Sequence, residues 1–148
     1  MHADFSDAAL VVLGHGTTKN DGSALPVMQH AAELRRRGLF VEVREAFWKQ
    51  APQLRQVLSE IKAPRVFIAP LFISEGYFSW EVIPRELGLT SNFRLQTPGF
   101  RLHYCRPVGT HDRMTEVVLA RAREVVAKYP FPRAPKPKDI TLFIAGHG

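Results

Sequence analysis

The sequence has almost no cysteine: Cys105 is the only one among 148 residues, so no internal disulfide can form. It has no apolar run approaching the ~20 residues that span a bilayer. Residues 1–7 lack the basic and apolar regions of a secretory signal. These absences predict a cytoplasmic protein with no membrane partner.

The sequence has fewer acidic than basic residues: 14 Asp and Glu against 20 Lys and Arg, which gives a formal net charge of +6. Such an excess attracts anionic partners over distance. The basic residues are scattered, except for Arg35, Arg36 and Arg37 at the end of an expected helix, where cations complement the helix dipole. No basic motif interleaved with aromatic residues appears. A solvated basic surface therefore explains the charge better than nucleic-acid binding.

Hydrophobic periodicity predicts strands that alternate with helices. The strands are expected at 9–13, 40–46, 66–73 and 102–105, and the helices at 23–37, 52–61, 80–87 and 114–125. This alternation predicts an α/β fold with right-handed crossovers. The two fully apolar strands belong at the centre and the two alternating strands at the edges. The prediction is a four-stranded parallel sheet, order 2-1-3-4, flanked by helices in a flavodoxin-like topology, with a ligand site between strands 1 and 3.

The chain also contains an internal repeat. An apolar strand runs into Gly-His-Gly at 10–16 and again at 140–148, after a proline-rich stretch. We expect a lobe at 1–128, a stiff linker at 129–138, and the start of a truncated second lobe at 139–148. A fifth strand of the same sheet is the alternative for the last segment.

Two polar residues leave the central strands at the expected switch point. Gly14 and Gly16 flank His15, so the backbone can approach a ligand closely and the imidazole is unshielded. Glu75 follows the third strand and would face His15, as a ligand or general base. A helix N-terminal acid that complements the dipole is an equal interpretation of Glu75.

Other candidates have simpler explanations. Tyr77, Phe78 and Trp80 suit an aromatic wall for a flat ligand or part of the core. Thr110 is expected to cap the last helix and to place His111 in its first turn, where a neutral imidazole could bind metal. Cys105 is expected to be a small core residue rather than a ligand.

Taken in order, these segments resemble the cobalt and iron sirohydrochlorin chelatases of the CbiX/SirB type. The resemblance covers most of 8–126 and looks like the N-terminal lobe of a tandem member. It is carried by the Gly14–His15–Gly16 loop, the helix led by Pro52, and the segments 70–76, 82–87 and 107–111.

The resemblance implies a lyase that inserts cobalt, or iron or nickel, into sirohydrochlorin or a related tetrapyrrole for cobalamin or siroheme synthesis. It implies catalysis by His15, with His15 as metal ligand, and no organic cofactor. Glu75 is our own candidate for the second catalytic group, as the acceptor of a proton. The implied partners are the anionic tetrapyrrole and a second chelatase lobe, in cis or from a homodimer. For such a substrate, we expect contacts from Thr17, Lys49, Ser74, Phe78 and Arg85.

Two positions depart from the family pattern. The family's second metal-binding histidine falls at Phe78, and its acidic residue after the second strand falls at Lys49. A non-catalytic module that binds a tetrapyrrole or metal is therefore the alternative function. A nucleotide- or phosphate-binding domain of the same topology is a third possibility, although the loop after strand 1 lacks the required glycine spacing.

Overall fold

The computed structural model describes residues 4–19, 22–89, 94–96, 99–129, 132–133 and 135–146, with 94–96 described by their backbone only. The chain forms two compact units, Met1–Thr110 and His111–Gly148, and each is treated by itself below. The second Gly-His-Gly ends at 147–148, outside the described residues.

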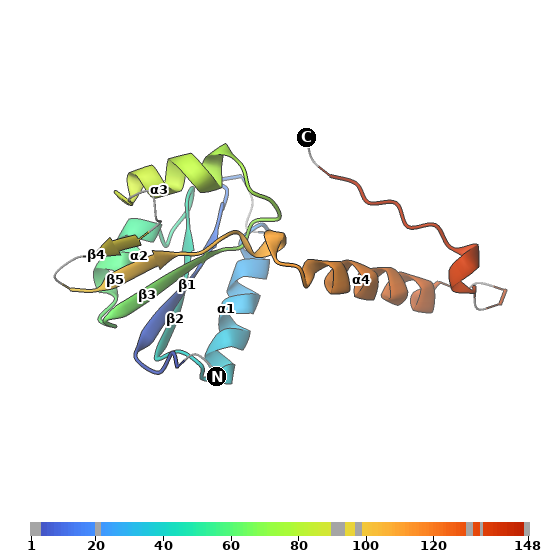
Figure 1. Ribbon diagram of the computed structural model, residues 1–148, viewed down its shortest axis with the longest axis horizontal. Helices are drawn as coiled ribbons and strands as arrows, with labels where there is room; N and C mark the ends of the chain where they lie inside the picture. The colour runs from blue at the N-terminus through green and yellow to red at the C-terminus, as the bar shows by residue number, and fades with distance from the viewer. Residues whose placement is uncertain are drawn as a thin grey trace. The chain divides into compact units, whose positions relative to one another are not determined.

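The first unit is built on a sheet with the order β2-β1-β3-β5-β4 (Figure 1). Four of its strands are parallel neighbours: β1 (Ala8–Gly14), β2 (Glu42–Phe47), β3 (Arg65–Pro70) and β5 (Arg101–Tyr104). They correspond to the four expected strands in the expected order, so the predicted α/β topology is confirmed. The third strand is shorter than the expected 66–73 at its carboxyl end, because β3 stops at Pro70, which has no backbone N–H to donate.

One detail of the predicted sheet is wrong. Residues 102–105 were expected at an edge, but β4 (Arg94–Gln96) pairs antiparallel with β5 and takes that position. The added strand has only three residues, which is too short to leave a period-2 pattern in the sequence. Parallel strands therefore occupy every position except this outer one.

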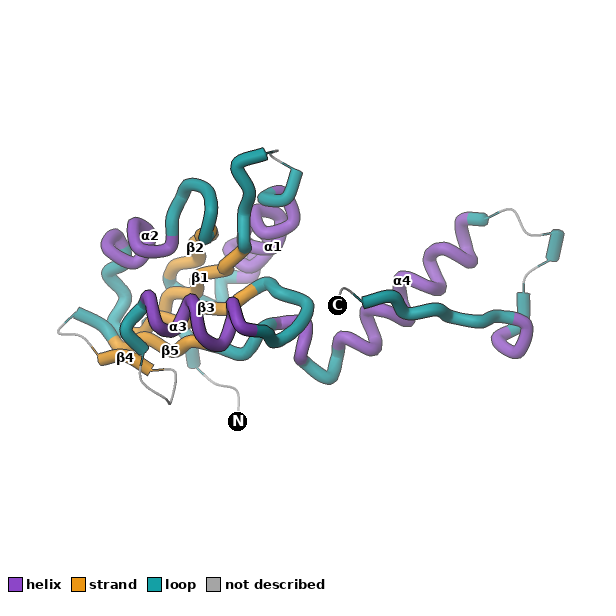
Figure 2. Tube along the Cα trace, turned by 90° about the horizontal axis from the view of Figure 1, so that it is seen from above, coloured by secondary structure: helices purple, strands orange, loops and turns teal. Residues whose placement is uncertain are grey.

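Hydrophobic residues of β1 alternate between two cores because successive side chains of a strand point to opposite faces. Val11 and Leu13 pack with residues of α2 (Leu54–Glu60) and α3 (Ile83–Glu86), whereas Leu10 and Val12 pack with α1 (Leu25–Arg37). Figure 2 shows α1 and α2 on different sides of β1 and β2. This burial on both faces explains why the central strand is apolar throughout.

Two helices of this unit, α1 and α3, end close to a glycine. Gly38 ends α1 with φ +62°, and Gly88 follows α3 with φ +67°, both in the left-handed region that glycine adopts without steric cost. The expected helix at 80–87 begins earlier, because a five-residue π-helix, Phe78–Val82, precedes α3. π-helical turns are frequent at functional sites.

The second unit contains α4 (Met114–Lys128), a 3-10 turn (Pro137–Asp139) and the extended residues 140–146. The predicted cap of α4 is wrong. Thr110 instead ends a 3-10 turn, where its hydroxyl donates to the Pro107 carbonyl, and Arg113 occupies the N-cap position. His111 precedes the helix, and its Nδ1 accepts the Arg113 N–H at 3.2 Å. Among the described residues, no helix combines the length and apolar character needed to cross a membrane.

Candidate functional site at the carboxyl ends of β1 and β3

The loops that leave β1 and β2 are hydrogen-bonded to each other. The register places Gly14 opposite Phe47, and the pairing continues beyond the strands. Trp48 N–H donates to the Gly14 carbonyl at 3.2 Å, and Lys49 N–H donates to the His15 carbonyl at 2.9 Å. The backbone at His15 is therefore fixed by the neighbouring strand.

The imidazole of His15 is exposed at this edge. Its Nδ1 lies 2.9 Å from the carbonyl oxygen of Gly16. A carbonyl oxygen can only accept, so this hydrogen bond requires the proton on Nδ1. In the neutral ring, Nε2 then carries a free lone pair and can take a proton or bind a metal.

Phe78, at the start of the π-helix, is the aromatic neighbour of His15. Its ring centroid lies 5.1 Å from that of His15 and 5.2 Å from that of Trp48. The ring centroid of Phe72 lies 5.8 Å from that of Phe78. The histidine therefore sits against an aromatic cluster formed by Phe72, Phe78 and Trp48.

Glu75 lies in the loop after β3 and forms an ion pair with Arg106, at 2.7 Å from Arg106 Nη2. Arg106 follows β5, so the pair ties two neighbouring loops together. A second tie is the hydrogen bond from Gly109 N–H to the Phe72 carbonyl, 2.8 Å long. The Glu75 carboxylate is thus engaged, but its side chain is still one-third exposed.

The remaining predicted site residues lie on the same loops or on α3. Thr17 is half-buried, and its N–H donates to Gln50 Oε1 at 2.8 Å. Lys49 and Ser74 are exposed, after β2 and β3 respectively. Arg85 is exposed on α3, where its carbonyl accepts the Gly88 N–H. The structure brings His15 together with Lys49, through a backbone hydrogen bond, and with Phe78, through a ring contact. No contact of His15 with Glu75, Ser74 or Arg85 is described, so the expectation that Glu75 faces His15 stays a prediction.

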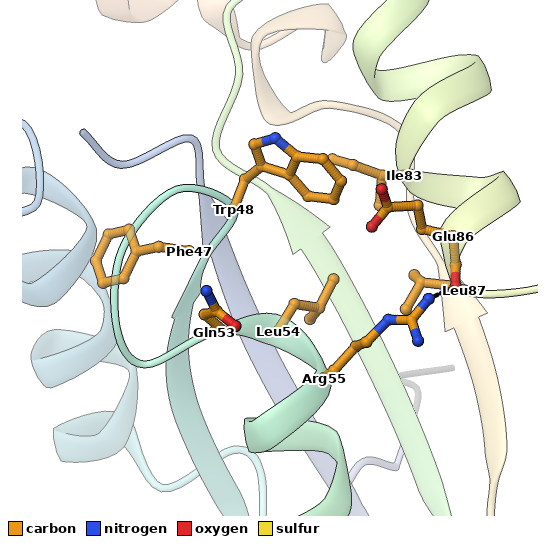
Figure 3. Close-up of a pocket in the computed structure, with 8 residues that line it drawn as sticks. All are labelled: Phe47, Trp48, Gln53, Leu54, Arg55, Ile83, Glu86 and Leu87. Carbon is orange, nitrogen blue, oxygen red and sulfur yellow. Dashed lines mark hydrogen bonds between the residues drawn. The ribbon is translucent and has the colours of Figure 1, made fainter. Parts of the chain in front are cut away.

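A small cavity of about 200 Å³ adjoins the aromatic cluster through Trp48 (Figure 3). Trp48 and Ile83 face each other at one end, and Arg55 reaches toward α3 at the other, donating to the Glu86 carbonyl at 2.8 Å. The volume of this cavity is below the roughly 300–1,000 Å³ of pockets that enclose drug-sized ligands. A larger ligand would have to lie on the open edge beside His15.

The described residues contain no group of three His, Cys, Asp or Glu side chains that could hold a metal ion. Cys105 is half-buried, and burial raises the pKa of its thiol, which disfavours the thiolate form that binds metals. His15 is therefore a single imidazole donor within this part of the chain. A metal bound there would need further ligands from a substrate or another lobe.

Sequence reasoning missed Trp48, Gln50 and Arg106. A signal for the first two was available, because the chain after the second strand must run beside the chain after the first in a parallel pair. Arg106 had no such signal, since its partner Glu75 is 31 residues away in sequence.

The fold and this edge of the sheet agree with comparisons to known proteins. The CbiX family model matches residues 9–125. The chain belongs to the CbiX family. The matched region contains every predicted site residue.

Two relatives of this CbiX chain carry chelatase names. A protein from Halobacterium salinarum, "Probable sirohydrochlorin cobaltochelatase", is 42% identical over 156 residues, covering 95% of this chain and 52% of the relative. The "Sirohydrochlorin cobaltochelatase" of Methanocaldococcus jannaschii is 25% identical, covering 77% of this chain and 96% of the relative. The chain thus spans about half the length of the first relative and matches nearly all of the second.

A solved structure supports the fold independently. A multi-domain protein from Deinococcus radiodurans, described as structurally similar to chelatases with two additional novel domains, superposes with a TM-score of 0.75 and 38% sequence identity. The match covers 82% of this chain and 29% of that protein. The parallel sheet described above is therefore shared with a longer, chelatase-like protein.

Proposed function

We propose that this CbiX chain carries a chelatase lobe that inserts cobalt(II) into sirohydrochlorin or a related tetrapyrrole, as a step of cobalamin biosynthesis. Iron(II) or nickel(II) is the alternative metal, for siroheme or a nickel tetrapyrrole. The observation that carries the proposal is the exposed imidazole of His15, whose Nε2 is left free by the Nδ1 contact with Gly16. The chelatase names of the relatives support the substrate class.

Insertion of a divalent metal releases two pyrrole N–H protons as four ring nitrogens bind the ion. Nε2 of His15 accepts one proton or hands over the metal, because imidazole suits cobalt, nickel and iron. The carboxylate of Glu75 takes the second proton. Its ion pair with Arg106 holds that carboxylate in place between the loops after β3 and β5.

The macrocycle lies against the open edge, since the adjoining cavity is too small to enclose it. Phe78 offers a flat apolar surface beside His15. Sirohydrochlorin carries many carboxylates, so the exposed cations of Lys49 and Arg85 anchor them through charge-assisted contacts. Hydroxyl groups of Thr17 and Ser74 add neutral hydrogen bonds.

A second chelatase lobe completes the cleft, either in cis or from a homodimer partner. His15 is a single donor, and the described residues form no three-ligand cluster, so one lobe leaves the metal under-coordinated. The repeated strand motif supports 139–148 as the start of such a lobe after the linker at 129–138. The twofold length of the Halobacterium salinarum relative agrees with this arrangement.

A non-catalytic module that binds a tetrapyrrole or metal is the second candidate. The observation in its favour is that Phe78 stands beside His15, where a ring nitrogen would add a metal ligand. Such a module would bind sirohydrochlorin without speeding metal entry.

Visible spectroscopy separates the two functions. Sirohydrochlorin is mixed with cobalt(II), with and without the protein, and the spectral change that accompanies metal insertion is followed over time. The proposal expects the protein to accelerate that change. Binding of sirohydrochlorin with an unchanged rate would contradict chelation and support the module.

A further inference from the structure

One peptide group links His15 to a side chain on the neighbouring strand. The peptide between Gly16 and Thr17 offers its carbonyl to His15 Nδ1 at 2.9 Å and donates its N–H to Gln50 Oε1 at 2.8 Å. A trans peptide is planar, so its C=O and N–H point in opposite directions and turn together. Whatever fixes the N–H also fixes the carbonyl that holds the imidazole.

Gln50 also packs tightly on this peptide. A Cβ at Gly16 would lie 2.8 Å from Gln50 Cγ and 3.1 Å from Gln50 Oε1. Gly16 has φ +71°, a conformation that favours glycine. The amide of Gln50 can therefore reach the Thr17 N–H only because Gly16 has no side chain.

We propose that Gln50 is a positioning residue for His15, which acts through the Gly16–Thr17 peptide to hold the imidazole as the Nδ1–H tautomer with Nε2 presented outward. In its catalytic consequence the inference rests on the proposed function, whereas the tautomer can be tested alone. Partners that orient a metal-binding histidine through its other ring nitrogen change metal affinity or activity by about 10–100-fold.

The choice of tautomer matters because the two ring nitrogens are not equivalent. In water the Nε2–H form is the commoner neutral tautomer, and it would place the lone pair against the Gly16 carbonyl. With Gln50 in place, the lone pair faces the open edge where a substrate would lie. Gln50 is half-buried, and its side-chain oxygen accepts from the Thr17 N–H, so its effect on His15 is indirect.

The test is ¹⁵N NMR of histidine-labelled protein with the rings neutral, in mildly alkaline buffer. Ring nitrogen shifts and their two-bond correlations distinguish the tautomers, and His15→Ala identifies the signals among the six histidines. Gln50→Met removes the acceptor at similar size, and Gln50→Glu keeps an acceptor oxygen. Gln56→Met, an exposed position on α2, is the matched control.

The expected result is that wild type, Gln50→Glu and Gln56→Met hold His15 as Nδ1–H, while Gln50→Met shifts it toward Nε2–H. Cobalt insertion should fall about 10–100-fold in Gln50→Met and recover in Gln50→Glu. Circular dichroism checks folding, and Gln50→Ala replaces the methionine variant if that one is unfolded.

An unchanged tautomer of His15 in folded Gln50→Met or Gln50→Ala would overturn the inference. Loss of the Nδ1–H tautomer in Gln50→Glu, which keeps the acceptor oxygen, would also overturn it. The tautomer readout does not depend on chelation. If the tautomer responds to Gln50 and no variant inserts cobalt, the positioning role stands and the proposed function falls.

Discussion

The imidazole of His15 lies 5.1 Å from the ring of Phe78, measured between centroids, with 53° between the ring planes. The two residues leave neighbouring central strands, β1 and β3, at the same edge of the sheet. An imidazole at Phe78 could share a metal ion with His15 at this separation. The side chain at Phe78 therefore decides whether the edge offers one metal ligand or two.

Phe78→His should strengthen cobalt(II) binding to the apoprotein. We expect the affinity for cobalt(II) to rise at least about tenfold, since even hydrogen-bonding partners of metal ligands change metal affinity by about 10–100-fold. The affinity is measured by titration with cobalt(II), followed by the visible absorption of the bound ion. Tyr77→His adds a histidine at the adjacent, 69% exposed position and should bind no better than wild type. Equal affinities for the two variants would contradict the proposed geometry.

Gly109→Ala should destabilise the loop that carries Glu75. A Cβ at Gly109 would lie 2.0 Å from the Ile73 carbonyl oxygen, so the two backbones must move apart. Overpacking of this kind costs about 1–3 kcal/mol of unfolding free energy. Denaturant unfolding measures the loss, and Gly76→Ala is the control because a Cβ there meets nothing within 4 Å. If the two variants were equally stable, the close approach of Gly109 to the Ile73 carbonyl would be contradicted.

Glu75→Gln tests the proton-acceptor role. Loss of a general base should reduce cobalt insertion by about 10²–10⁴-fold, whereas an exposed ion pair contributes at most about 1 kcal/mol to stability. Arg106→Gln breaks the same pair but keeps the carboxylate, so its rate should fall less. If both variants lowered the insertion rate by the same small factor, Glu75 would only link the loops after β3 and β5 and would not accept a proton.

Stability should decline in acid partly through Glu33. Hydrogen bonds from Arg36 and Arg37 lower the pKa of this carboxyl from 4.5 to about 2. The folded state resists protonation that the unfolded chain accepts, so the contribution is complete above pH 4.5 and is lost as pH falls toward 2. Thermal melts of wild type and Glu33→Gln should converge over that window, and salt should weaken the difference. Parallel curves would contradict the assignment.

Periodicity and polarity were enough to predict the parallel sheet and its order. Residues 9–13 are apolar on both faces of the sheet because α1 packs against one face and α2 and α3 pack against the other. The strand Arg94–Gln96 escaped prediction because three residues carry no period. The cap at Thr110 was wrong because its hydroxyl bonds backward to Pro107 rather than forward to a helix.

For the candidate site, the switch-point rule predicted that the loops after β1 and β3 lie at the same end of the sheet, and the parallel pairing of these strands confirms it. The sequence could not give the ion pair between Glu75 and Arg106 or the contact of Thr17 with Gln50, which depend on side-chain reach between loops. The Nδ1 contact of His15 was equally out of reach, because local loop dihedrals set it. The proposal thus combines a position predicted from the sequence, His15, with an atom, Nε2, that the Nδ1 contact leaves free.

The most direct test compares cobalt(II) insertion into sirohydrochlorin by wild type, His15→Ala and His30→Ala, followed by visible spectroscopy. His30 is exposed on α1, so its loss controls for the removal of a surface imidazole. We predict that wild type and His30→Ala accelerate insertion and that His15→Ala, folded by circular dichroism, does not. Insertion by His15→Ala at the wild-type rate would contradict the central role of His15.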